Sequence, residues 1–297
     1  MLLLCLALFM SSFVDGGYSQ GVNSATSSPP DCYLRFGGNT DPGELGYLYN
    51  SITTDLTGIC KLIKQQLIHP TRIKDFPELS GLAGEDTNFY SVRDMLAELL
   101  KRNPRGLVQD RAPAERLRVS CRFHALLLVS ILRAQGIPSR ARVGFASYLS
   151  PPGLNKSIDH WICEVWDRQR TKWILVDPDL RKIDFDRSEF DFAGDVWLRV
   201  QNHGEDPSRY GVARWWGKEY IKANVIHDLS CVLNTELIYW EGPLLSREGL
   251  SAFTASDYSL LNEVAQALGN VDNNLEILRQ LHKDSRLGSI VKYQRYR

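Results

Sequence analysis

Apolar residues recur at helical spacing in three segments of the first half of the chain. The first segment, residues 44–68, predicts one long amphipathic helix that ends at His69-Pro70. The second, residues 91–102, has Ser91 in a capping position and Pro104 just beyond its end. The third, residues 121–134, is apolar nearly all round, which is typical of a buried helix, and Gly136 follows it.

Three strand-like runs follow the buried helix, at residues 139–149, 159–167 and 171–180. The short "DRQR" turn between the last two predicts that they are antiparallel neighbours. Helical spacing returns over residues 217–237, 256–268 and 273–285. The order of elements therefore predicts an α+β fold in which a central helix packs on an antiparallel sheet, with further helices on either side in the sequence.

The two ends of the chain differ from its middle in composition. Residues 1–30 combine a short apolar run with a Gly-, Ser- and Pro-rich stretch, which indicates either a signal-like segment or a disordered start. We expect one domain over residues 31–245. Residues 246–297 are expected to form a helical segment, either a cap on the same core or a partner-binding arm. We expect a cytoplasmic protein, or a secreted one if residues 1–16 are a signal peptide.

Charge and cysteine content exclude several classes of function. Lys plus Arg and Asp plus Glu both number 35, so the chain lacks the basic excess typical of nucleic-acid binding. The apolar run at the start is too short to span a membrane. The six cysteines are scattered, which argues against a disulfide framework and a zinc site. We therefore expect no nucleic-acid partner, no membrane span, no metal and no cofactor.

One cysteine occupies a position suited to chemistry. Cys121 begins the buried helix, where free backbone N–H groups and the helix dipole favour a thiolate. His160 begins the second strand run and Asp177 closes the third, so the turn between these strands brings the two side by side. A cysteine facing this pair forms a Cys–His–Asp triad, in which the histidine acts as base and the aspartate orients it.

The order of these motifs resembles the transglutaminase-like superfamily, whose core is papain-like. The resemblance rests on a cysteine that opens a helix ending in "LRAQGIPSRARVGF", followed by "DHWICEVWD" and "KWILVDPDL", and it covers residues 117–180. The segments "NTDPGE", "DRAPAERLRVSCR" and "GDVWLRVQNHGEDPSRYG" resemble bacterial transglutaminase-like proteins of unassigned function. The resemblance implies that Cys121 is the nucleophile, His160 the base and then the acid, and Asp177 the residue that orients it.

The chain departs from the pattern of classical transglutaminases, which use a tryptophan upstream of the cysteine to hold the oxyanion. The first tryptophan here is Trp161, directly after His160, so we consider Gln109, Trp161 and Glu164 as oxyanion or substrate-contacting candidates. We expect hydrolysis of an amide bond in a peptide or small molecule. The alternatives are transfer of the acyl group to an amine and a non-catalytic binding module. The oligomeric state stays open.

Overall fold

The computed structural model describes residues 29–53, 55–247 and 249–292, so the predictions for the apolar start of the chain lie outside the described residues. The α-helices of the described residues are α1 (Leu56–Gln66), α2 (Val92–Arg102), α3 (Cys121–Ala134), α4 (Ala193–Asn202), α5 (Lys218–Val232), α6 (Leu244–Arg247), α7 (Ala255–Leu268), α8 (Val271–Leu281) and α9 (Ser285–Gly288). In this part of the chain, none of the helices is long and apolar enough to cross a membrane.

The central sheet has the strand order β6-β5-β4-β3-β7, and β8 and β9 extend it at the start of β4. Its strands are β3 (Ser139–Ala146), β4 (Ser157–Asp167), β5 (Lys172–Asp177), β6 (Lys182–Ile183), β7 (Phe190–Phe192), β8 (Tyr210–Val212) and β9 (Trp215–Trp216). β4 runs antiparallel to both β3 and β5, which confirms the predicted neighbours. Two small pairings lie outside this sheet: β1 (Leu67–Ile68) with β2 (Leu117–Arg118), and β10 (Glu241–Pro243) with β11 (Ile290–Lys292).

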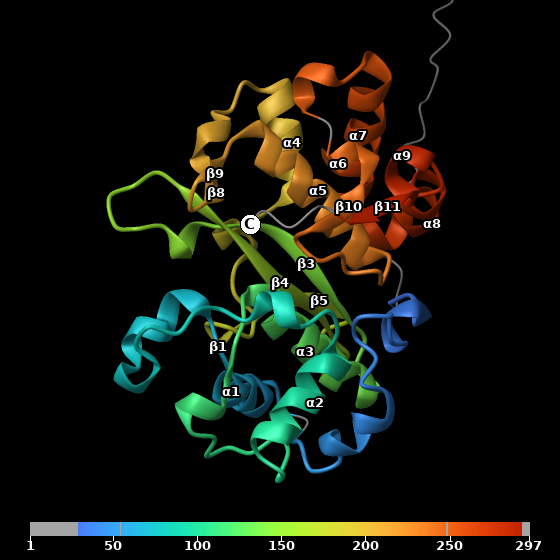
Figure 1. Cartoon of the computed structure of the whole chain (residues 1–297). Helices are drawn as coiled ribbons and strands as arrows, with labels where there is room; N and C mark the ends of the chain where they lie inside the picture. The colour runs from blue at the N-terminus through green and yellow to red at the C-terminus, as the bar shows by residue number, and fades with distance from the viewer. Residues whose placement is uncertain (1–28, 54, 248, 293–297) are drawn as a thin grey trace, which may run out of the picture.

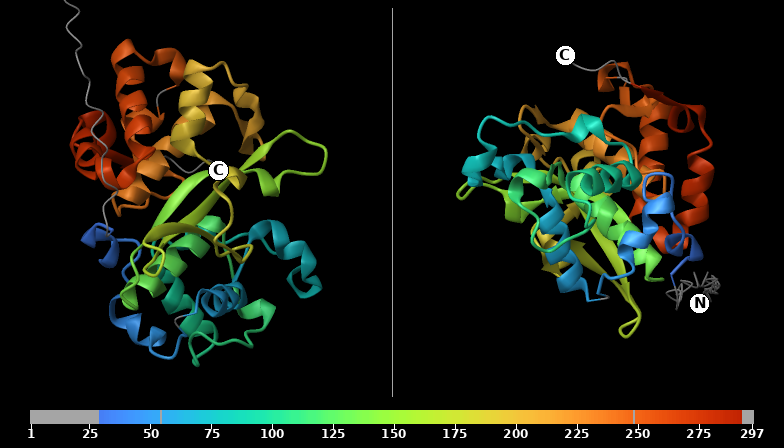
Figure 2. Two further views of the ribbon diagram at one scale, coloured as in Figure 1. Left: turned by 180° about the vertical axis from the view of Figure 1, so that it is seen from behind. Right: turned by 60° about the horizontal axis from the view of Figure 1, so that its bottom comes forward.

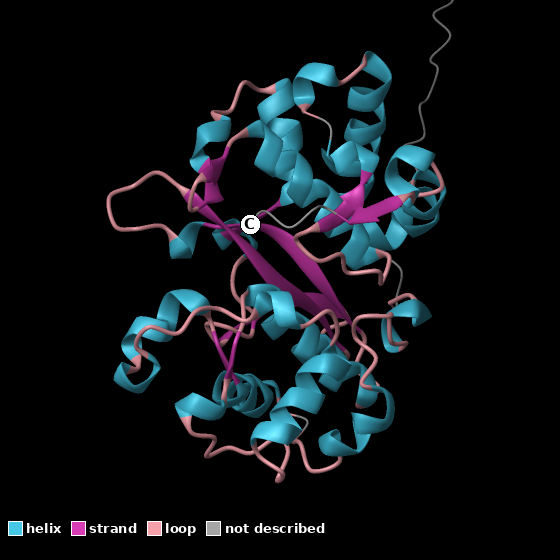
Figure 3. Cartoon of the chain, viewed as in Figure 1, coloured by secondary structure: helices cyan, strands magenta, loops and turns pink. Residues whose placement is uncertain are grey.

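Helices lie on both sides of the central strands. Figures 1 and 2 show α1, α2 and α3 on one side of β3, β4 and β5, and α4 to α9 on the other. The buried helix α3 packs on the sheet through a core that includes Val143, Trp161 and Cys163. Figure 3 shows the same arrangement of strands between two groups of helices. The predicted α+β class, with a central helix on an antiparallel sheet, is confirmed.

A second apolar core joins the helices of the C-terminal half. Val196 and Trp197 of α4, Val225 of α5 and Leu261 and Val264 of α7 all belong to it and are buried. Helix α7 therefore packs directly on α4 and α5. The domain division at residue 245 stays a prediction.

The predicted long helix over residues 44–68 is wrong in its first half. Residues Gly43–Tyr49 form a 3-10 helix, and α1 begins only at Leu56. The reason is Asp55, whose carboxylate accepts hydrogen bonds from the N–H groups of Thr57 and Gly58 and so caps a new helix. The predicted helix also ends two residues too late, because α1 stops at Gln66 and Leu67 and Ile68 form β1.

Candidate active site

Cys121 is the first residue of α3, and neighbouring groups fix the backbone before it. The N–H group of Ser120 donates to Asp86 Oδ1 at 3.0 Å, and the Ser120 hydroxyl binds the same oxygen. The helix that follows is almost wholly buried, so its first turn cannot move without disturbing the core. The thiol of Cys121 is only 5% exposed. The local sequence therefore produces a rigidly placed thiol at a helix N-terminus.

Arg122 ties the start of α3 to distant parts of the chain. Its buried guanidinium donates to the carbonyl oxygens of Leu237 at 3.0 Å, Glu236 at 2.6 Å and Tyr90 at 3.3 Å. Carbonyl groups satisfy the donors of a buried guanidinium without neutralising its charge. Arg122 therefore holds the 236–237 segment over the first turn of α3.

His160 and Asp177 lie together on neighbouring strands. Cys163 pairs with Val176, so Asp177 lies opposite Ile162, and alternation places the side chains of Ile162 and His160 on one face. His160 Nε2 lies 2.9 Å from Asp177 Oδ2, and both side chains are buried. The other ring nitrogen, Nδ1, is left to face Cys121.

Two further groups hold the Asp177 carboxylate in place. The Tyr148 hydroxyl donates to Oδ2 at 2.9 Å, and the backbone N–H of Leu180 donates to Oδ1 at 3.0 Å. The Tyr148 ring also meets the His160 ring edge to face, with centroids 6.3 Å apart. These contacts fix the orientation of both the carboxylate and the imidazole.

The charges of this group favour an ion pair between thiolate and imidazolium. Burial opposes ionisation of Cys121, but the field of His160 and hydrogen bonds from His160 and His69 lower the pKa of its thiol. Burial likewise opposes protonation of His160, but the charges of Asp177 and Cys121 raise its pKa well above the ordinary value. Although burial raises the pKa of Asp177, the charge and hydrogen bond of His160 bring it below the ordinary value. The neighbouring groups thus favour the thiolate form of Cys121, which is the nucleophilic form of a cysteine.

Two residues at the thiol were absent from the sequence-based prediction. The Tyr239 hydroxyl lies 3.8 Å from Cys121 Sγ and 3.4 Å from Ser120 Oγ. His69 follows β1, which pairs in parallel with β2 just before Cys121. The only signal for His69 was its place before Pro70. For Tyr239 we find no sequence signal, since it lies in an irregular segment 118 residues after the cysteine.

The remaining candidates take other positions. Gln109 is exposed in the connection between α2 and β2, and it is not among the side chains that act on the Cys121 thiol most strongly. Trp161 is completely buried beneath α3, with its ring 6.1 Å from the Tyr239 ring. Glu164 is buried in an ion-pair network, where it accepts from Arg140 Nε at 2.5 Å and Arg142 Nη1 at 2.9 Å. These ion pairs explain the buried position of Glu164, so no contact with a substrate is needed to explain it.

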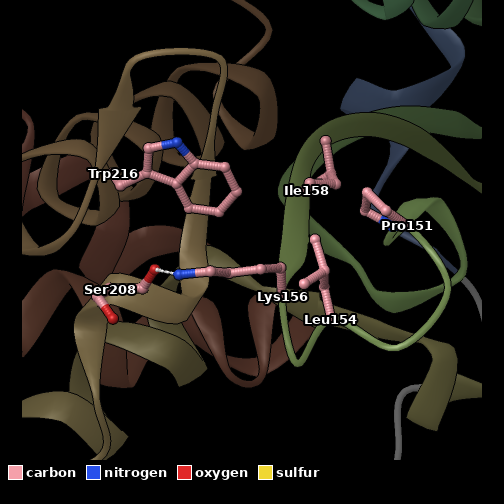
Figure 4. A pocket seen from close by; sticks show the side chains of 6 residues that line it. All are labelled: Pro151, Leu154, Lys156, Ile158, Ser208 and Trp216. Carbon is pink, nitrogen blue, oxygen red and sulfur yellow. Dashed lines mark hydrogen bonds between the residues drawn. The ribbon is translucent and has the colours of Figure 1, made fainter.

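A cavity of about 400 Å³ is lined by residues of the β3–β4 loop, by Ile158 of β4, and by Ser208 and Trp216; neither Cys121 nor His160 lines it. Figure 4 shows the Trp216 ring on one side and Ile158, Pro151 and Leu154 on the other. Ile158 precedes His160 by two residues, so their side chains share a face of β4. The Lys156 ammonium donates to the carbonyl oxygen of Ser208 at 2.6 Å and lies 5.0 Å from the centre of the Trp216 ring. The walls of the cavity are mainly apolar.

The described residues contain no group of three or more His, Cys, Asp or Glu side chains that could hold a metal ion. Cys32, Cys60, Cys121, Cys163 and Cys231 are all free thiols.

Comparison with known proteins finds a family model that is similar to the part of the chain around the site. Residues 99–178, which include Cys121, His160 and Asp177, match the model of the transglutaminase-like superfamily. Among solved structures, a proposed cysteine protease from Cytophaga hutchinsonii is similar, with 18% identity over 55% of this chain and a TM-score of 0.33. The match covers 47% of that protein, so the chain spans about half of its length. No curated protein matches the chain.

Proposed function

We propose that this chain, which contains a transglutaminase-like domain, is a cysteine-dependent enzyme that hydrolyses an amide bond through Cys121, His160 and Asp177. The family match supports a cysteine-dependent enzyme in general. The observation that carries the finer proposal is the arrangement at the start of α3: a thiol of lowered pKa faces a histidine, whose other nitrogen lies 2.9 Å from a buried carboxylate.

The first half of the reaction forms a thioester. The Cys121 thiolate attacks the carbonyl carbon of the amide, and the carbonyl electron pair moves onto oxygen. When the tetrahedral intermediate collapses, the C–N bond breaks and the His160 imidazolium gives its proton to the leaving nitrogen. An amine departs, and the acyl group stays on Cys121 Sγ.

The second half releases the acyl group. His160, now neutral, takes a proton from water as the water oxygen attacks the thioester carbonyl. The C–S bond then breaks, the carboxylic acid leaves, and the thiolate–imidazolium pair returns. Asp177 stays ionised throughout and holds the imidazole, with Tyr148 and Leu180 fixing its own position.

The cavity that contains Ile158, two residues before His160 on β4, offers a place for part of the substrate. Two residues along a strand correspond to about 7 Å, which is the distance between adjacent side chains on one face. A substrate whose carbonyl lies at Cys121 can therefore place a neighbouring apolar side chain against Ile158 and Trp216. This geometry supports a peptide with an apolar residue beside the cleaved bond.

Selective alkylation tests the activated thiol. Burial raises the pKa of Cys60 to about 12 and raises those of Cys163 and Cys231 well above the ordinary value. We therefore expect iodoacetamide near neutral pH to label Cys121 first, and we expect His160→Ala to slow this labelling. Peptide mapping by mass spectrometry gives the rate at each cysteine. Equal, slow labelling of all thiols would argue against the proposal.

Activity is measured on a panel of peptide amides with apolar side chains, with and without added alkylamines. Cys121→Ala should lower the rate by at least about 10³-fold, while Cys32→Ala, a loss of a thiol away from the site, should leave it unchanged. A carboxylate product shows hydrolysis, and a new amide formed only with added amine shows acyl transfer instead. If the wild type and Cys121→Ala behave alike across the panel, the result argues against the proposal and favours the binding module.

A further inference from the structure

We infer that His69 is a second hydrogen-bond donor to the Cys121 sulfur, and that the same Nε2–H group stabilises the oxyanion that forms when the sulfur attacks a carbonyl. The donor role at the thiolate stands on the structure of the free protein. The role at the oxyanion rests on the proposed function above.

The short parallel pairing of β1 with β2 places His69 close to Cys121. Leu67 pairs with Leu117 and Ile68 with Arg118, and the N–H group of Val119 donates to the Ile68 carbonyl at 2.9 Å. This register leaves His69 beside Val119, two residues before Cys121. Neighbouring strands are about 4.8 Å apart, which brings an imidazole on one within reach of a side chain on the other.

The hydrogen bonds of the His69 ring fix which nitrogen carries the proton. Its Nδ1 accepts from the backbone N–H of Thr71 at 3.3 Å and lies 2.8 Å from the Thr71 hydroxyl. A neutral imidazole has one donor and one acceptor nitrogen, so an accepting Nδ1 leaves the proton on Nε2. The Thr71 contacts also hold the ring in one orientation.

His69 and His160 therefore have different roles at the same sulfur. Nε2 of His160 is taken by Asp177, which equips this histidine to shuttle a proton. His69 has no carboxylate at hydrogen-bond distance among the described residues and is held instead by Thr71. A donor that is fixed in place and has no carboxylate partner suits the stabilisation of negative charge better than it suits proton transfer.

A second donor of this kind is what the first turn of α3 requires. The N–H group of Cys121 lies at the first helical position, where it has no partner within the helix. One free N–H binds an oxyanion weakly, whereas two converging donors form a hole. Of the two histidines hydrogen-bonded to Cys121, His160 is engaged by Asp177, so His69 supplies the second donor.

Several titratable groups lie around His69 and Cys121. His160 and Tyr239 contact or face the sulfur, and Asp177 lies behind His160. Asp179 acts on His69 from the β5–β6 turn, where it binds Lys64 at 2.7 Å and lies 3.7 Å from His124. Asp159 also lies near both histidines and accepts from Tyr220 and Asn224. Burial opposes protonation of His69, but its hydrogen bond to Cys121 and the charges of Cys121 and Asp179 raise its pKa, against a smaller opposing effect of His160.

Two substitutions separate the donor role from a structural one. The amide nitrogen of glutamine can occupy the place of Nε2, so His69→Gln keeps a donor at the sulfur. Asparagine reaches only as far as Nδ1, so His69→Asn keeps an acceptor for Thr71 but removes the donor. The buried neighbour His124, whose ring is 6.4 Å from that of His69, provides a control as His124→Asn.

The first readout is the pH dependence of iodoacetamide labelling at Cys121, which requires no substrate. We expect His69→Asn to shift the midpoint upward by roughly one to two pH units, with His69→Gln and His124→Asn close to wild type. Melting curves confirm that each variant is folded. If folded His69→Asn keeps the wild-type midpoint, His69 does not donate to the sulfur and the inference is overturned.

The second readout is turnover of the peptide amide found in the panel above. His69→Asn should lower kcat by about 10²–10³-fold with little change in KM, and His69→Gln should recover most of the loss. Equal losses in both variants would assign His69 a structural role and overturn the oxyanion part. A shifted labelling midpoint in a protein that cleaves no amide would refute the proposed function while leaving the donor role supported.

Discussion

Glu236 and Glu164 are two buried carboxylates with opposite surroundings. Neither oxygen of Glu236 has a hydrogen-bond partner among the described residues, and the Arg133 guanidinium is 4.0 Å away. Burial therefore raises the pKa of Glu236 to about 7. Glu164 is equally buried, but Arg140 and Arg142 both bind it and lower its pKa to about 2. The two residues should thus affect stability in opposite ways.

We expect Glu236 to make the protein less stable as the pH rises. Between its ordinary pKa and about 7, the folded protein holds a proton that the unfolded chain has lost, so folding becomes less favourable as the pH rises. The loss is on the order of 3 kcal/mol. Glu236→Gln should remove this decline, as measured by urea unfolding at pH 5 and pH 8.

Glu164→Gln is the matched control for this prediction. The Glu164 carboxylate is charged in the folded protein at both pH values, so its substitution should lower stability at pH 5 and pH 8 alike. If wild type and Glu236→Gln lose stability in parallel between the two pH values, Glu236 does not carry the effect.

Among single residues, the sequence could predict those site contacts in which both residues belong to adjoining elements of one motif. His160 and Asp177 are 17 residues apart and belong to adjoining strands, so one tight turn explains their meeting. His69 reaches Cys121 through strands of two residues, which are too short to show any period. Tyr239 depends on the placement of an irregular segment by Arg122, which no pattern of apolar residues reveals.

Gly144 lies at the closest approach between two strands of the sheet, directly opposite His160. A Cβ atom here would lie 2.1 Å from the carbonyl oxygen of Asp191 and 2.9 Å from Cα of Phe192 on β7. Gly144→Ala should push β7 away and destabilise the protein by roughly 1–3 kcal/mol, as measured by thermal unfolding. The shift of β3 should also reduce the selective labelling of Cys121.

Gly38→Ala is the control, because a Cβ atom at Gly38 meets nothing within 4 Å. This variant should melt within a few degrees of wild type. If Gly144→Ala melts at the same temperature as Gly38→Ala, the strands at this point are farther apart than the structure has them.

Among the helices and strands, the predictions that succeeded were those supported by a clear capping or terminating residue in the sequence. α2 has a capping box in which Ser91 and Asp94 bind each other's backbone N–H groups, and α3 ends at Gly136 in a left-handed conformation. Both helices were predicted from such signals. The helix over residues 44–68 was predicted from spacing alone, and the cap formed by Asp55 interrupts it. Strand β7 has three residues and no predicted counterpart, because its place depends on β3.

For the whole molecule, a buried ion network connects the sheet to the helices on its far side. Arg142 of β3 donates to both oxygens of Asp228 on α5 at 2.9 Å and to Glu164 at 2.9 Å. Arg140 extends the network to Asp272 of α8 at 2.6 Å. Since these side chains are buried or nearly so, the loss of one partner leaves a charge without compensation.

A double-mutant cycle tests this connection. Arg142→Met and Asp228→Leu should each destabilise the protein by about 3–5 kcal/mol in urea unfolding, and the double variant should lose clearly less than their sum. The physical reason is that the double variant leaves no unpaired charge between these positions, although Glu164 keeps Arg140. Strictly additive losses would show that the pair is not coupled.

The bonds from Arg122 to the 236–237 segment also have a consequence for the order of biosynthesis. The groups at the thiol come from His69, Cys121, His160, Asp177 and Tyr239, so the last of them leaves the ribosome well over one hundred residues after the cysteine. A nascent chain that has reached only the end of α5 contains Cys121, His160 and Asp177 but lacks the 236–237 segment to which Arg122 binds. The completed environment of the thiol is therefore a late product of translation, and the unfinished chain does not yet have it.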